Sequence, residues 1–191
     1  MEIRTPRLLL RELAESDAAA ANLYESDPAV VRYQSHPPRS LAESLAYIRR
    51  VHTETAASSP RRLFDLAVTL RDPPPDSPPG AAGSSYIGRI GLNVTDPGSG
   101  QAVLWYILHP AQWGHGYIPE AAHALLDFGF AELGLHRVMV DTDPRNLASI
   151  RVAQKLGMRK EAHLIENVFL KGEWCDSLLF AILKREWNSR G

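Results

Sequence analysis

The sequence contains a single cysteine, Cys175, among its 191 residues. One cysteine cannot form an intrachain disulfide, and so sparse a use of cysteine fits a reducing compartment. The chain also lacks an apolar stretch of about 18 residues, the length of a membrane span, and its N-terminus has no apolar core of signal-peptide length. We therefore expect a cytoplasmic protein without a membrane segment.

The chain also has no large excess of positive or negative charge. The chain has 21 Lys and Arg residues against 22 Asp and Glu residues, so no overall field attracts nucleic acid or anionic lipid. Its seven histidines show no metal-ligand spacing. We expect no direct binding of nucleic acid, no membrane partner and no metal.

Hydrophobic residues make up 45% of the chain, enough for one ordinary domain that buries most of its apolar surface. We expect a single domain over residues 1–191. Pro, Gly, Ala and Ser dominate residues 71–85, which predicts a surface loop between two strands rather than a linker between domains.

The first half of the chain predicts two helices and an antiparallel meander of strands. The Ser-x-x-Glu spacing of Ser40 and Glu43 is that of a capping box at a helix start. Apolar residues alternate with others over residues 64–70, which predicts a strand with one well-buried face. The expected elements are a strand at 8–10, helices at about 16–24 and 41–55, and strands at 64–70, 86–94 and 102–108.

The second half changes character and alternates strands with helices. Gly134 and Gly157 each follow a stretch with helical apolar spacing, as expected of residues that end helices. The expected elements are helices at 119–133 and 146–156 and strands at 138–140, 168–170 and 177–183. The order as a whole is that of a mixed α/β fold.

One segment combines a strand, a glycine turn and a helix start. Residues 104–108 form the predicted strand, Gly114 and Gly116 the turn, and Pro119 and Glu120 the first helical turn. Such an arrangement binds anions, because the free N–H groups and the dipole of the helix point at the turn. A plain tight turn is the alternative. A Walker-type loop would need Gly-Lys-Ser/Thr and a dinucleotide fingerprint a third glycine, and neither is present.

The segment Trp113-Gly114-His115-Gly116-Tyr117-Ile118-Pro119-Glu120-Ala121 resembles the Gln/Arg-x-x-Gly-x-Gly/Ala pattern of the GNAT family of N-acetyltransferases. It is more similar to the RimJ/RimL-type branch of that family, whose members typically read Trp-Gly-Lys-Gly-Tyr-Ala-Thr-Glu-Ala at these positions. The resemblance extends over nearly the whole chain and includes residues 5–8, 87–91, 146–149, 155–158 and 172–176. It implies a twisted, mostly antiparallel sheet of about seven strands, splayed between the fourth and fifth, with helices on both faces. It also implies acetyl transfer from acetyl-coenzyme A to a primary amine.

The resemblance assigns roles by position. The backbone of Leu108 and His109, at the end of the fourth predicted strand, would contact the pantetheine arm of coenzyme A. An N–H there would also donate to the oxyanion formed from the thioester. The glycine turn at residues 114–118 would bind the pyrophosphate of coenzyme A. Asn146 would contact coenzyme A beside the thioester, and Ser149 would lie near the departing sulfur. The expected cofactor-binding residues are Leu108, His109, Trp113, Gly114, His115, Gly116, Tyr117, Ile118, Asn146 and Ser149.

Ser149 and Glu166 are the candidate catalytic residues. Ala153 stands where many relatives have a tyrosine, so Ser149, or a water, is the expected proton donor. A plain helix-capping or helix-surface serine is the alternative for Ser149. Glu166, Glu161 and Asp141 are the available bases, and the sequence leaves the choice among them open. Direct transfer needs no acyl-enzyme, so Cys175 is expected to be a buried or inert thiol.

The acceptor amine follows from the resemblance and from acid-base chemistry. An α-amine with a pKa of about 8 is partly neutral at cellular pH, whereas a lysine amine near about 10.4 must lose its proton first. A weak base therefore suffices for a protein N-terminus, which is the expected acceptor. A small amine, such as an amino acid, polyamine or antibiotic, and a non-catalytic module that senses acyl-coenzyme A are the alternatives. A homodimer is left open.

Overall fold

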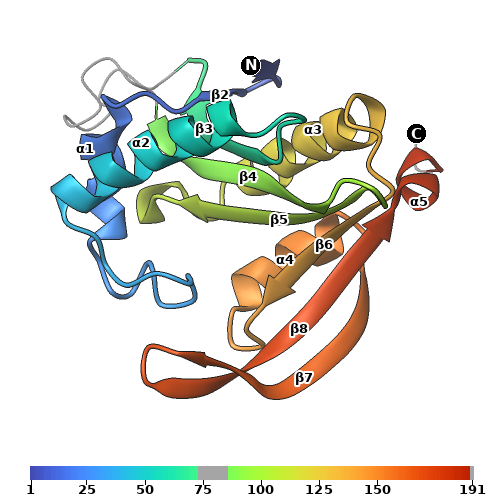
Figure 1. Cartoon of the computed structure of the whole chain (residues 1–191). Helices are drawn as coiled ribbons and strands as arrows, with labels where there is room; N and C mark the ends of the chain where they lie inside the picture. Colours follow the sequence, from blue (N-terminus) through green and yellow to red (C-terminus); the bar gives the residue numbers. More distant parts are fainter. Residues whose placement is uncertain (73–85, 190–191) are drawn as a thin grey trace.

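The computed structural model describes residues 1–72 and 86–189, so the expected loop at 71–85 lies almost entirely outside the described residues. An open sheet with strand order β1-β2-β3-β4-β5-β6-β8-β7 carries helices on both faces (Figure 1). Its strands are β1 (Glu2–Arg4), β2 (Leu8–Glu12), β3 (Leu63–Leu70), β4 (Tyr86–Asp96), β5 (Gln101–Leu108), β6 (Arg137–Thr142), β7 (Arg159–Leu170) and β8 (Glu173–Leu183). Its helices are α1 (Asp17–Glu25), α2 (Leu41–Ala57), α3 (Tyr117–Ala131), α4 (Leu147–Lys155) and α5 (Lys184–Asn188), with a short 3-10 helix at Pro110–Gln112.

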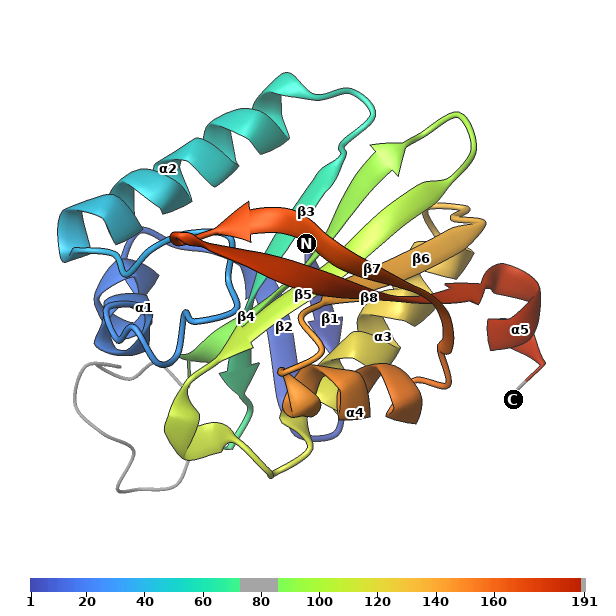
Figure 2. The same cartoon turned by 90° about the horizontal axis from the view of Figure 1, so that it is seen from below.

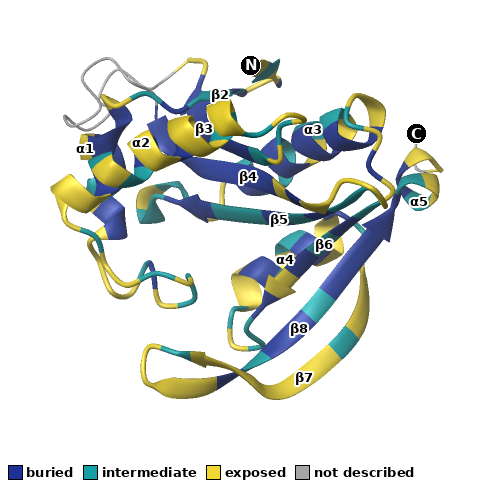
Figure 3. Cartoon of the chain, viewed as in Figure 1, coloured by how far each residue is buried: buried dark blue, intermediate teal, exposed yellow. Residues whose placement is uncertain are grey.

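The predicted mixed α/β sheet is confirmed, with two differences in its strands. The described sheet has eight strands rather than about seven, because β1 adds to the edge beside β2. Strand β7 begins at Arg159, nine residues before the predicted strand at 168–170. Almost all of β7 is exposed (Figure 3), and a strand without a buried face has no apolar period to reveal it.

Strand β3 corrects the expectation of one buried face, because both of its faces are covered. Leu66 and Val68 belong to the core under α3, whereas Ala67 belongs to a second core under α1 and α2. The polar side chain of Asp65 lies on the α1 and α2 side and is fully buried. The alternation of residues 64–70 therefore reflects two different cores and not a core and solvent.

A buried cluster of ion pairs explains how the Asp65 carboxylate can be buried. Arg89 on β4 donates from Nη1 to Asp65 Oδ2 (2.9 Å) and from Nη2 and Nε to Glu25 Oε1 (2.7 and 3.0 Å). The Tyr47 hydroxyl donates to the same Asp65 oxygen (2.7 Å). Burial raises the pKa of Asp65, and the positive charge of Arg89 opposes that rise. Buried charges of this kind are stable only as pairs.

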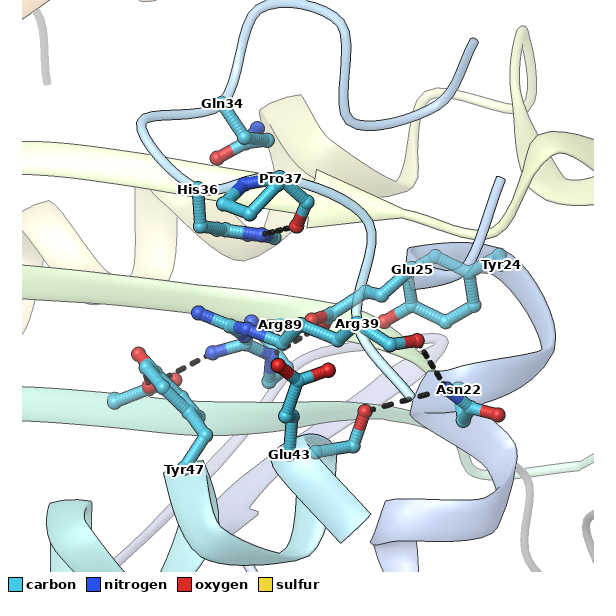
Figure 4. Close-up of polar contacts among 12 residues, drawn as sticks. Asn22, Tyr24, Glu25, Gln34, His36, Pro37, Arg39, Glu43, Tyr47 and Arg89 are labelled. Carbon is cyan, nitrogen blue, oxygen red and sulfur yellow. Dashed lines mark hydrogen bonds and ion pairs between the residues drawn. The ribbon is translucent and has the colours of Figure 1, made fainter. Parts of the chain in front are cut away.

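The cluster also fixes the α1–α2 loop (residues 26–40). Arg39 donates from Nη1 to Glu25 Oε2 (2.8 Å), and its backbone N–H donates to the Glu25 carbonyl oxygen (3.1 Å). The Asn22 side-chain amide donates to the Arg39 carbonyl oxygen (2.7 Å) (Figure 4). The two ends of the loop are thus joined to each other and to the buried cluster on the sheet. At the start of α2 the predicted capping box of Ser40 and Glu43 is confirmed.

We predict that Arg89→Met lowers the free energy of unfolding by about 3–5 kcal/mol, because it leaves buried carboxylates without their cation. Adding Asp65→Asn should recover part of the loss by removing one of these charges. In Arg89→Met the pKa of Asp65 in the folded protein would lie further above its value in the unfolded chain. The folded state then binds the proton more tightly than the unfolded state, so this variant should gain stability as the pH falls toward the ordinary aspartate pKa. Urea denaturation at several pH values measures both effects.

Arg50→Met is the matched control, since Arg50 also lies over the Tyr47 ring but is exposed and pairs only with Glu54. Its loss should stay below about 1 kcal/mol. Equal losses for Arg89→Met and Arg50→Met would contradict the role given to the buried cluster.

Candidate active site

The sheet opens between β5 and β6. These strands pair in parallel at only three positions, where Gln101, Ala102 and Val103 lie opposite residues 137–139. Beyond them β5 and β6 run apart, and β6 pairs along its whole length with β8 instead (Figures 1 and 2). The predicted splay is therefore present, and Leu108, Asn146 and Ser149 among the expected site residues lie near it.

The end of β5 has one side on β4 and the other on the divergence. The His109 N–H donates to the Ile87 carbonyl oxygen on β4 (2.8 Å). Because backbone groups alternate in direction along a strand, the Leu108 N–H and carbonyl point the other way. The Leu108 carbonyl oxygen accepts from the Trp113 indole (2.9 Å). Of the two expected backbone donors, His109 is thus bonded within the sheet, and only Leu108 directs its N–H toward the divergence.

The glycine turn has the backbone that an anion site requires. Gly114 and Gly116 have φ values of 80° and 79°, in the left-handed region that favours glycine. Gly116 is the N-cap of α3, and the first helical bond runs from the Glu120 N–H to its carbonyl oxygen (3.2 Å). The N–H groups of Tyr117 and Ile118 precede that bond. A Cβ built on Gly114 would meet no heavy atom within 4 Å, so the turn is open and fits a diphosphate.

Arg7 adds a cation to this turn that sequence reasoning missed. Its guanidinium donates to the His115 carbonyl oxygen (3.0 Å) and to Glu120 Oε2 (2.6 Å), and it lies 4.7 Å from the centre of the Tyr117 ring. The His115 ring stacks on the same Tyr117. Burial alone would raise the pKa of Glu120, but hydrogen bonds from Thr5 and Arg7 lower it. Glu120 therefore holds Arg7 beside the turn.

Asn146 and Ser149 open helix α4 next to the divergence. Asn146 is the N-cap, and its Oδ1 accepts from the Ser149 N–H (3.1 Å). The alternative interpretation of Ser149 as the capping residue is therefore wrong, because Asn146 has that role. The Ser149 side chain is buried, and its hydroxyl lies 2.6 Å from the hydroxyl of Tyr106. Ala153, at the position of the family tyrosine, is fully buried.

Tyr106 on β5 is a second residue that the sequence did not indicate. It follows the three positions paired with β6, and its phenol reaches the first turn of α4. Burial raises the pKa of Tyr106 to about 12, with the hydrogen bond to Ser149 opposing the rise. The phenol therefore stays protonated at any physiological pH.

The carboxylates considered as bases lie elsewhere on the C-terminal strands. Glu166 sits in a bulge of β7 with φ 44°, two strands from β6, and its N–H donates to Asp176 Oδ1 (2.9 Å). Glu161 pairs with Arg137, which lowers the pKa of Glu161 to about 2 and makes it a poor base. Asp141 on β6 is exposed. No hydrogen bond joins any of these three carboxylates to Ser149.

A lysine joins the two halves of the sheet on the side of the α1–α2 loop. Lys171, at the tip of the β7–β8 hairpin, donates from Nζ to the carbonyl oxygens of Val31 (2.5 Å), Gln34 (2.8 Å) and Arg32 (3.2 Å). An ammonium has three N–H donors, so all are used. The Gln34 side-chain amide in turn donates to the Tyr106 carbonyl oxygen (3.2 Å). The hairpin, the loop and β5 are thus linked.

Three expectations concern features outside this constellation. Cys175 is buried as expected, and its Sγ lies 3.4 Å from Arg145 Nη2. Among residues 1–72 and 86–189, no three His, Cys, Asp or Glu side chains come together as a metal site would require. The helices of the same described part include none that is long and apolar enough to cross a membrane.

Comparison with known proteins identifies the class as acetyl-coenzyme A-dependent N-acetyltransferases. The chain is 31% identical over 188 residues to YnaD, an uncharacterized N-acetyltransferase of Bacillus subtilis, covering 98% of this chain and 100% of YnaD. A crystal structure of a GNAT-family acetyltransferase from Bacillus anthracis has a TM-score of 0.81 at 26% identity, covering 97% and 100% of the two chains. The acetyltransferase (GNAT) domain model matches residues 7–159. The chain belongs to the GNAT family.

We predict that Lys171→Met speeds amide hydrogen exchange at residues 31–34 by roughly tenfold or more, because each hydrogen bond from a charged donor contributes about 1.5–3 kcal/mol. Methionine keeps the apolar stem and removes the three donors. Lys160→Met, at the far end of the exposed strand β7 that leads to this hairpin tip, is the control and should leave that exchange unchanged. Equal exchange at residues 31–34 in the two variants would show that the bridge does not hold the loop.

Proposed function

We propose that this acetyltransferase transfers the acetyl group directly from acetyl-coenzyme A to the α-amine of a protein N-terminus. The observation that carries the proposal is the buried Ser149 hydroxyl, which α4 holds beside the divergence of β5 and β6. The cofactor would lie along that divergence, with its pyrophosphate on the turn of residues 114–118 and Arg7 beside it.

The residues at the divergence suit a direct transfer between two bound substrates. The Leu108 N–H can donate to the carbonyl oxygen of the thioester as negative charge develops there. Ser149 can give its proton to the departing sulfur. Cys175 is buried beside Arg145 and has no part in this scheme. The reducing compartment that a lone cysteine suggests fits a cytoplasmic enzyme.

The arginine pairing of three carboxylates favours an acceptor with one amine over a polyamine. Glu25, at the end of α1, pairs with Arg39 and Arg89, and Glu173 and Asp143, at the start of β8 and just after β6, both pair with Arg145. None of the three is left free to bind a second ammonium group. The names of relatives point both ways. RimL, a ribosomal α-N-protein acetyltransferase, shares the fold at 18% identity (TM-score 0.80), and 87 residues are 27% identical to spermidine N(1)-acetyltransferase of Escherichia coli. The choice of a protein N-terminus over a polyamine as acceptor therefore rests on the arginine-paired carboxylates together with the Trp113–Tyr117 motif.

Release of coenzyme A thiol with a panel of amines tests the acceptor. We expect turnover with peptides that have a free N-terminus. The same peptides with a blocked N-terminus and an internal lysine should give none, because the lysine amine stays protonated. Turnover confined to polyamines, amino acids or aminoglycosides would replace the protein N-terminus by a small amine. Cofactor binding without thiol release from any amine would favour a sensing module.

We predict that Ser149→Ala lowers kcat roughly ten- to hundredfold, because it removes the proton donor to the sulfur. The loss should stay at the low end for a general acid, since a thiol is a good leaving group that needs less help from one. The dissociation constant of acetyl-coenzyme A should not change, since the contribution belongs to the transition state. Ser44→Ala, which truncates a buried serine of α2, is the control and should keep full kcat. A Ser149→Ala protein with normal kcat and a lowered melting temperature would remove Ser149 from the reaction.

We predict that Gly116→Val weakens acetyl-coenzyme A binding by roughly tenfold or more, as expected for losing on the order of 1–2 kcal/mol of anion stabilisation at a helix N-terminus. Gly134→Val imposes a similar backbone strain beyond the other end of α3, with φ 66° and open space around the Cβ. Both variants should lose stability, but only the first should lose affinity in calorimetry. Equal affinity of the two folded variants would rule out the turn as the pyrophosphate site.

A further inference from the structure

The hydroxyl pair of Tyr106 and Ser149 spans the place where the sheet has no backbone pairing. Tyr106 lies beyond the three positions of β5 that pair with β6, and its phenol oxygen is 2.6 Å from Ser149 Oγ on α4. The backbone carbonyl of Tyr106 is held by Gln34, whose own carbonyl accepts from Lys171. Both ends of the tyrosine are thus fixed.

The direction of the hydrogen bond follows from the acidity of the two groups. A phenol is a stronger donor than an alkyl hydroxyl, so the short contact is best made by the Tyr106 O–H donating to Ser149 Oγ. The Ser149 carbonyl oxygen is a poorer acceptor for Tyr106, at 3.4 Å. The Ser149 N–H is already bonded to Asn146. This arrangement leaves the Ser149 proton free to turn toward the divergence.

Tyr106 can act in this way without giving up its proton. Burial raises its pKa to about 12, so the phenolate is disfavoured throughout the working range. In the transfer the C–N bond forms and the C–S bond breaks. The sulfur takes the proton of Ser149 Oγ, the amine nitrogen releases one to water, and water returns a proton to Ser149. No oxidant, metal or covalent enzyme intermediate enters this balance.

We propose that Tyr106 is a positioning residue for the transfer, and that its phenol donates to Ser149 Oγ and thereby aims the Ser149 proton at the departing sulfur. The inference rests on the proposed role of Ser149. It adds a tyrosine from the sheet, in place of one on α4, as the group that orients the leaving-group donor.

The test is Tyr106→Phe, which removes one oxygen and keeps the ring in place. We expect kcat to fall about three- to tenfold, as is typical of losing one hydrogen bond, with unchanged KM for the amine and unchanged affinity for acetyl-coenzyme A. In a Ser149→Ala background the same change should cost nothing more, because the two hydroxyls act as a unit. An unchanged kcat, or a loss that adds fully to that of Ser149→Ala, would overturn the proposal.

A second measurement needs no acceptor amine. The ultraviolet absorbance of the thiolate gives the pKa of the thiol in bound coenzyme A, and a hydroxyl that donates to the sulfur lowers that pKa. We expect Tyr106→Phe and Ser149→Ala each to raise it by about one, and the double variant to match Ser149→Ala. An unchanged thiol pKa in Tyr106→Phe would refute the positioning role even if no acceptor amine is found.

Tyr86→Phe is the matched control. Tyr86 lies on β4, and its buried hydroxyl bonds the hydroxyl of Tyr24 (3.1 Å) on the face covered by α1 and α2. Its loss should lower the melting temperature and leave kcat and the thiol pKa unchanged. A thiol pKa that shifts equally in Tyr86→Phe and Tyr106→Phe would show a general effect of losing a buried hydroxyl and would overturn the proposal. Failure of wild-type turnover with every amine would count against the proposed function alone.

Discussion

The parallel pairing of β5 with β6 at three positions is the constraint on which the rest of the molecule depends. It is short enough to let the strands separate afterwards, and it is the backbone connection between the two halves of the described sheet. The N-terminal half is an antiparallel meander, and the C-terminal half is built on β6, β8 and β7. Tyr106, Asn146 and Ser149 lie around the point where these halves part, whereas Glu166 lies in β7, two strands from β6.

Where β5 and β6 have no backbone pairing, side-chain contacts hold the two halves of the sheet in place. Tyr106 on β5 contacts Ser149 on α4 across the separation, and Lys171 reaches from the tip of the β7–β8 hairpin to the α1–α2 loop. The loop is itself held by Glu25, which shares the buried cation of Arg89 with Asp65. The polar cluster buried in the N-terminal half and the tip of the C-terminal hairpin therefore hold the same loop.

Local sequence patterns predicted the parts of this structure that depend on neighbouring residues. The capping box at Ser40, the glycine turn before α3 and most strands of the meander follow from spacing alone. The contacts of the site do not, because Tyr106 and Ser149 are separated by 43 positions and Lys171 and Gln34 by 137. Nor could alternation show that the even and odd residues of β3 enter different cores. Only the resemblance to the family singled out Ser149, and nothing in the sequence singled out Tyr106.

The closed base of the α1–α2 loop has a consequence for how such an enzyme can diversify. Its ends are hydrogen-bonded to each other, from the Arg39 N–H to the Glu25 carbonyl oxygen. Insertions between these ends that leave the contacts of residues 31–34 intact cost little loop-closure free energy. The turn at residues 114–118 offers backbone groups, whose chemistry survives most substitutions. Natural variation or engineering can therefore change the length and sequence of the α1–α2 loop while the backbone of the glycine turn stays the same.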